Sequence, residues 1–143
     1  MREMELASSI FDYMDVRRIR NENSRWLTGN PNKIGIWQQL KFYWSKPKNI
    51  ELYVCREFGS VVAYMLLRHE AETCFITEVV DVLYRGENIA SDMILFAQFH
   101  YPNITAEILN SNVASIRLHE KMGFKLVSES EHKLTYNWRH NDN

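Results

Sequence analysis

Glycine is scarce in this sequence of 143 residues. Only five are present, where average usage would give about ten. Glycine adopts left-handed backbone conformations more easily than any other residue, so each one raises the question of which backbone geometry it serves. The five are Gly29, Gly35, Gly59, Gly86 and Gly123.

An excess of one charge is also missing, because 17 Lys and Arg residues face 18 Asp and Glu residues. Dedicated nucleic-acid-binding domains usually carry a strong basic excess, so the composition argues against that class. The longest wholly apolar run, Val61 to Leu67, is too short to cross a bilayer, and the charged N-terminus leads into no signal-peptide core. We therefore expect neither a nucleic-acid nor a membrane partner.

Cysteine is rare, with Cys55 and Cys74 the two residues of this type. They form no CxxC pair and lie in strand-like apolar surroundings, which predicts buried free thiols and a cytoplasmic location. The sequence has no His and Cys spacing typical of zinc, and no HExxH, Walker A or GxSxG motif. No metal site is predicted.

The apolar residues that are present, 45% of the chain, suffice for one core, and we expect a single domain over residues 1–143. Their spacing predicts helices over residues 12–27, 33–45, 88–101 and 112–122, and strands over 50–58, 61–67, 74–83, 104–109, 124–127 and 133–138. This order predicts an α/β (α+β) domain in which helices cover both faces of one sheet.

A strand, a short polar turn and a helix follow one another over residues 78–97. The first turn of such a helix exposes unpaired backbone N–H groups at the positive end of the helix dipole. That arrangement suits a phosphate or a pyrophosphate. Taken alone, the turn is also consistent with a plain connection between a strand and a helix.

Two segments in this order resemble the GNAT superfamily of N-acetyltransferases. The turn matches the family pattern Arg/Gln-x-x-Gly-x-Gly/Ala at Arg85 and Ala90. A later segment matches the patterns Asn-x-x-Ser/Ala and Leu-Tyr-Glu-Lys-x-Gly-Phe at Asn112, Ser115, Leu118, Glu120, Lys121, Gly123 and Phe124. The resemblance implies a mixed, mostly antiparallel sheet of about six to seven strands and an enzyme that uses acetyl-CoA.

The resemblance also implies where acetyl-CoA binds. Its pyrophosphate is expected on backbone N–H groups of the turn, its pantetheine arm beside the strand at Val80 to Val82, and Asn112 near that arm. The expected cofactor-binding residues are Val80, Asp81, Val82, Arg85, Gly86, Glu87, Asn88, Ile89, Ala90, Ser91, Asn112 and Ser115. Asn112 equally suits a helix N-cap, and the two roles are compatible.

The sequence departs from the family pattern at two positions. Asn88 replaces the central glycine of the turn, and asparagine is among the residues that best tolerate a positive φ. His119 replaces a tyrosine that is often assigned as the general acid. With an ordinary pKa of ~6.5, a histidine can serve as an acid near neutral pH, so His119 could protonate the departing thiolate.

Acetyl transfer to an amine requires a group that accepts the proton of the amine. Glu107 is one candidate, because it precedes His119 by a spacing similar to that of a glutamate and a tyrosine in ribosomal-protein N-terminal acetyltransferases. Glu78 is the rival, because it lies two residues before Val80 and shares its face of the strand, whereas Asp81 points to the opposite face. A backbone N–H beside Val80 is the expected donor to the oxyanion.

The acceptor is left open between a small molecule, an amino sugar and a protein N-terminus. Five aromatic residues come from the segments that shape acceptor sites in this fold, and their helical spacing predicts that most are core; they are Trp26, Trp37, Phe42, Tyr43 and Trp44. The alternative function is a catalytically weak or inactive GNAT fold that binds acyl-CoA or a partner. An exposed strand near the end of the chain could also pair two copies into a homodimer.

Overall fold

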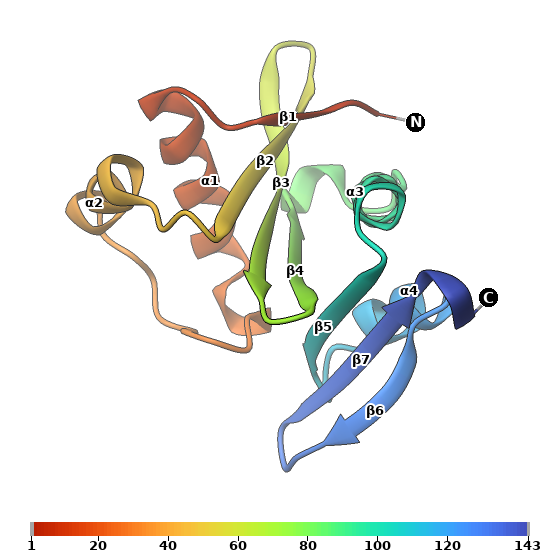
Figure 1. The fold of residues 1–143 in the computed structure, drawn as a ribbon. Helices are drawn as coiled ribbons and strands as arrows, with labels where there is room; N and C mark the ends of the chain where they lie inside the picture. The colour runs from red at the N-terminus through yellow and green to blue at the C-terminus, as the bar shows by residue number, and fades with distance from the viewer. Residues whose placement is uncertain (1, 143) are drawn as a thin grey trace.

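The structure is a computed structural model and describes residues 2–142. It contains a seven-stranded sheet in the order β1-β2-β3-β4-β5-β7-β6 (Figure 1). The strands are β1 (Met4–Leu6), β2 (Ile50–Glu57), β3 (Ser60–Glu70), β4 (Thr73–Val80), β5 (Asn103–Leu109), β6 (Lys125–Glu129) and β7 (Lys133–Arg139). The helices are α1 (Ile10–Glu22), α2 (Ile36–Ser45), α3 (Ile89–His100) and α4 (Val113–Lys121), with short 3₁₀ turns η1 (Ser24–Trp26), η2 (Val82–Tyr84) and η3 (His140–Asp142).

The sheet is antiparallel except where β4 meets β5. Within residues 2–142, these two parallel strands are in register at two positions, Cys74 with Ile104 and Phe75 with Thr105. Beyond those pairs the strands separate, which Figure 1 shows as a gap between green β4 and teal β5. The mixed, mostly antiparallel sheet predicted from the sequence is confirmed.

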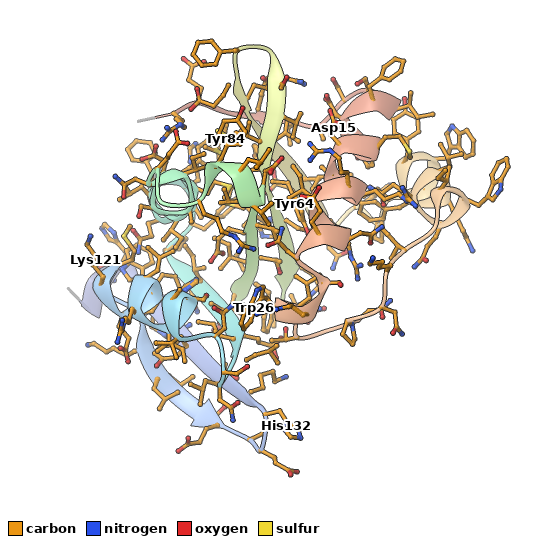
Figure 2. The ribbon with its side chains drawn as sticks, turned by 180° about the vertical axis from the view of Figure 1, so that it is seen from behind. Asp15, Trp26, Tyr64, Tyr84, Lys121 and His132 are labelled. Atoms are coloured by element: carbon orange, nitrogen blue, oxygen red, sulfur yellow. The ribbon has the colours of Figure 1, made fainter. Side chains whose placement is uncertain are left out.

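Each face of the sheet carries its own apolar core, because successive side chains of a strand point to opposite faces. On one face, Tyr13 and Ile19 of α1 pack with Tyr64 and Val79, and Figure 2 shows Tyr64 between the sheet and α1. On the other face, helix α3 and helix α4 pack over the sheet; the buried residues there include Met65, Ile76, Met93, Ile94 and Ile104. Helices therefore cover both faces, as predicted.

The strand predicted to run to Leu83 ends three residues earlier, at Val80. Asp81 stops it, because its side chain accepts a hydrogen bond from the N–H of Leu83 at 2.9 Å and so begins turn η2. The expectation that the strand continues to Val82 was therefore wrong. The first helix also ends earlier than predicted, at Glu22, and turn η1 follows it. Strand β1 is only three residues long and gave no recognisable pattern.

Helix α2 turns a different side to the core from the one that its apolar residues suggest. Gln39 is buried and donates a hydrogen bond to the backbone oxygen of Tyr13 at 2.7 Å, while Phe42 and Tyr43 pack against the ring of Tyr13. Trp37 and Trp44 lie on the outer side, with 79% and 69% of their surface exposed. The expectation of core positions was wrong for these two tryptophans.

The prediction for the two cysteines is confirmed, because Cys55 and Cys74 are buried and carry free thiols. No helix within the described part of the chain has the length and apolar character that a membrane span requires. Strand β6 forms one edge of the sheet and all five of its residues are exposed, so pairing of two copies there stays a prediction.

Candidate active site

A cavity of about 550 Å³ opens where β4 and β5 separate. One wall comes from turn η1 and the loop after it, and Figure 2 shows Trp26 of that turn near strand β5. The opposite wall comes from the start of α4. Eight of the predicted site residues line the cavity: Glu78, Val80, Arg85, Ala90, Glu107, Asn112, Ser115 and His119.

Backbone groups of β4 face this cavity without a strand partner. The N–H of Asp81 donates to the carbonyl oxygen of Val62 in β3 at 2.8 Å. Because backbone groups alternate in direction along a strand, the N–H groups of Val80 and Glu78 point the other way, toward the gap. An extended ligand can therefore hydrogen-bond to β4 much as a neighbouring strand would.

The turn between β4 and α3 has the backbone shape of an anion-binding turn. Gly86 and Asn88 both adopt positive φ, at 83° and 64°, so asparagine keeps the left-handed conformation where the family pattern has glycine. The side chain of Asn88 does not cap α3 within the described structure. The N–H groups of Ile89, Ala90 and Ser91 in the first turn thus have no side-chain cap within residues 2–142.

Other predicted cofactor residues lie away from the cavity walls. Asp81 faces α1, where its carboxylate contacts Arg18 at 2.8 Å. Burial alone would raise the pKa of Asp81, but the N–H of Leu83 and the guanidinium of Arg18 outweigh it and lower that pKa. Val82 and Glu87 are exposed on the turn, and the guanidinium of Arg2 contacts Glu87, which offsets its negative charge. Asp81 therefore stabilises the start of the turn from the face of the sheet that carries α1.

His119 and Glu78 form a buried pair at one side of the cavity. His119 reaches in from α4 with its side chain 2% exposed, and its Nε2 lies 2.8 Å from Oε1 of Glu78. Its Nδ1 donates a hydrogen bond to the backbone oxygen of Ser115, one helical turn earlier, at 2.7 Å. The ring also packs edge-on against Phe124, which fixes its plane. The imidazole is therefore held by contacts on three sides.

The partners of His119 determine its protonation. A backbone carbonyl only accepts hydrogen bonds, so Nδ1 must carry a proton, and Nε2 faces the carboxylate of Glu78 at an ion-pair distance without the alignment of a hydrogen bond. Burial alone would lower the pKa of His119, but the charge of Glu78, the contact with its carboxylate and the Ser115 carbonyl raise that pKa. His119 is therefore more readily protonated than an ordinary histidine.

Glu107 lies on the opposite face of the sheet from this pair. Its carboxylate contacts the ammonium of Lys133, and its other oxygen is 3.9 Å from the guanidinium of Arg68. The spacing in the sequence associates Glu107 with His119, but the structure brings Glu78 to His119 instead. The cavity is thus lined by one glutamate on each face of the sheet, Glu78 on the face that carries α4 and Glu107 on the face that carries α1.

Asn23 was not predicted as part of the site. It is 5% exposed, lines the cavity and donates from Nδ2 to the carbonyl oxygens of Ile19 and Val80, at 2.8 and 3.3 Å. Its Oδ1 accepts a hydrogen bond from the guanidinium of Arg85. Asn23 therefore ties the end of α1 to the end of β4 and to the turn. No pattern in the sequence connects positions so far apart.

Over residues 2–142, no group of three or more His, Cys, Asp or Glu side chains is arranged to hold a metal ion. The polar groups of the cavity are backbone amides, two carboxylates, a histidine, a guanidinium, an indole, amides and hydroxyls. Such groups suit hydrogen bonding and proton transfer.

A family profile described as an acetyltransferase (GNAT) domain matches residues 40–143. The chain belongs to the GNAT family. It is 27% identical to the SPbeta prophage-derived uncharacterized N-acetyltransferase YokL of Bacillus subtilis, over 80% of this chain and 68% of that protein. As a member of the GNAT family, the protein is an acyltransferase, as the sequence motifs predicted.

Solved structures confirm the GNAT fold. An N-acetyltransferase from Staphylococcus aureus Mu50 superimposes with a TM-score of 0.77 at 22% identity, covering 98% of this chain and 99% of that one. A putative acetyltransferase, yncA of Salmonella typhimurium, solved with its cofactor acetyl-CoA, gives a TM-score of 0.76 at 18% identity, covering 98% and 94%.

Proposed function

We propose that this GNAT protein transfers the acetyl group of acetyl-CoA to a primary amine in the cavity between β4 and β5. The observation that carries the proposal is the gap itself, which places unpaired backbone groups of β4 beside the buried pair of Glu78 and His119. The Salmonella relative that was solved with acetyl-CoA has the same fold, which supports this choice of donor.

The residues of the gap and the turn fit acetyl-CoA. The backbone of β4 along the gap offers hydrogen bonds to the amides of a pantetheine arm, and the turn from Arg85 to Ser91 offers N–H groups to a pyrophosphate. Asn112 caps α4 by accepting from the N–H of Ser115 at 3.3 Å, and it also lines the cavity where the arm would pass. When bound, acetyl-CoA supplies an acetyl group activated as a thioester.

Glu78 and His119 manage the protons. Glu78 accepts the proton that the acceptor amine loses, and His119 holds a proton at Nε2 that it can release toward the sulfur. The 2.8 Å contact between Nε2 and Oε1 of Glu78 lets the proton return to His119 afterwards. The backbone N–H of Val80 is the donor to the carbonyl oxygen of the acetyl group. Glu107 is then left to bind the acceptor.

The acceptor reaches the cavity from the face covered by α1. Trp26, Thr28 and Gly29 line the cavity on that face together with Glu107. The carboxylate of Glu107 lines the cavity, and its two partners, Arg68 and Lys133, are partly exposed. Donor and acceptor would thus meet through the gap from opposite faces. The two buried free thiols fit a reducing cytoplasm, where we place the protein.

Two measurements test this proposal. Calorimetry with acetyl-CoA should show binding, and an assay of thiol release over a panel of primary amines should show turnover with at least one of them. Absence of binding at millimolar acetyl-CoA would contradict the cofactor assignment. Binding without turnover for any amine in the panel would favour the alternative of an inactive acyl-CoA-binding protein.

A further inference from the structure

A second, smaller cavity of about 150 Å³ adjoins the first on the face of the sheet that carries α1. The two cavities are adjacent, because they share five lining residues: Thr28, Gly29, Ile76, Thr77 and Glu107. The smaller cavity adds Leu66, Phe75 and Arg68. A molecule whose amine lies in the large cavity can therefore reach Arg68 with its other end.

Arg68 is oriented in this space, and its contacts with Glu70 and Glu107 are ion pairs without an aligned hydrogen bond. Its guanidinium lies over the ring of Phe75, with Cζ 4.6 Å from the ring centre, and this stacking fixes the plane of the group. Its Nε is buried and makes no hydrogen bond within residues 2–142, although Oε1 of Glu70 is 3.1 Å away. Glu107 is 3.9 Å from the guanidinium, beyond hydrogen-bond distance.

The charges around the smaller cavity leave room for an anion. Glu107 lies between two cations, Arg68 and the ammonium of Lys133. Glu70, the other neighbour of Arg68, is half exposed, so solvent screens its charge. A guanidinium with free N–H groups binds carboxylates and phosphates through two parallel hydrogen bonds.

We infer that the acceptor is a small amine that also carries an anionic oxygen group, a carboxylate or a phosphonate, and that Arg68 binds that group. The inference rests on the proposed acetyl transfer and specifies its acceptor. Arg68 is then a specificity-determining residue at the far end of the acceptor site. The amine of such a molecule points toward the gap and Glu78.

A matched set of acceptors tests the inference. β-Alanine, 2-aminoethylphosphonate and propylamine present the same kind of amine with a carboxylate, a phosphonate or a methyl group. We expect the enzyme to prefer one of the two anionic amines over propylamine by at least tenfold in kcat/KM, and the preferred one identifies the anionic group.

Substitution of Arg68 separates this role from catalysis. Arg68→Gln should raise KM for the preferred anionic amine at least tenfold, with little change in kcat, in KM for propylamine or in acetyl-CoA affinity. Arg139→Gln removes an exposed arginine that lines neither cavity and should change none of these values.

Calorimetry of the three amines with the CoA-loaded protein gives the same comparison without turnover. Equal affinity for all three, or an Arg68→Gln protein that keeps the preference, would overturn the inference and leave the proposed acetyl transfer intact. Failure of the wild-type protein to bind acetyl-CoA would instead overturn the proposed function.

Discussion

The two sides of the cavity differ in how they are built. The side formed by α3 and α4 is buried, and its titratable groups, His119 and Glu78, contact each other. The side formed by η1, the loop after it and the end of β3 is partly open, and its charged groups, Arg68 and Glu107 with Lys133 beside them, are each partly exposed. A buried pair holds its groups in a fixed geometry, whereas an open charged surface gives room for recognition. We therefore assign the chemistry to the first side and acceptor choice to the second.

Exchanging the two glutamates for glutamine is the strongest test of this comparison. Glu78→Gln removes the proton acceptor and should lower kcat by about 10²–10³-fold, while acetyl-CoA affinity measured by calorimetry stays within a few-fold. Glu107→Gln, the matched control on the other side, should act mainly on KM for the acceptor. A larger loss of kcat in Glu107→Gln than in Glu78→Gln would reverse the assignment.

The pH dependence of His119 should give a smaller but distinctive effect. Its pKa is raised in the folded protein, so the pair with Glu78 stabilises the fold fully below about pH 6.5, the ordinary histidine value, and loses this contribution as pH rises through the folded-state pKa. Both kcat and the free energy of unfolding should therefore decline over that range.

Denaturant unfolding and kcat, each recorded from pH 5.5 to 9, would show whether His119 causes the decline in kcat and in the free energy of unfolding. In His119→Gln, kcat should be reduced at every pH, and the part of both profiles that follows the histidine titration should disappear. An unchanged rate and an unchanged pH profile in that variant would remove His119 from the mechanism.

The smallest expected effects concern the turn. Asn88→Ala forces alanine into a left-handed conformation that costs roughly 1–2 kcal/mol, so acetyl-CoA affinity should fall by about tenfold, whereas Asn88→Gly should bind within about threefold of the natural protein. Ala71, in the turn between β3 and β4, also has positive φ, at 52°. Ala71→Gly is the control, and should stabilise the fold without changing acetyl-CoA affinity.

The sequence could predict the turn before α3 and the start of α4, because the information for both is local. The turn from Arg85 to Ala90 and the segment that starts at Asn112 are each continuous in the chain, and their backbone geometry depends on nearby residues. The left-handed conformation of Asn88 is compatible with its residue type, because asparagine tolerates a positive φ. The same holds for the element order, which follows from apolar periodicity.

The acceptor side could not be predicted in this way, because it is assembled from distant segments. The contacts of Arg68 with Glu107 and of Asn23 with Val80 depend on strand register and on where α1 ends. The choice of Glu78 as the partner of His119 depends on how far β4 and β5 separate, which no single strand specifies. Helix α2 likewise buries Gln39 instead of Trp37, because its place against α1 decides which side is covered.

The division of the cavity between its two sides is tested most directly by a crystal structure of the protein with acetyl-CoA. We expect the pyrophosphate on the N–H groups of the turn, with Gly86 and Asn88 still at positive φ, and the pantetheine arm along Val80 on the side of α4. The thioester should lie beside Glu78 and His119. A cofactor seated on the other side, against Trp26 and Arg68, would contradict the assignment of both sides.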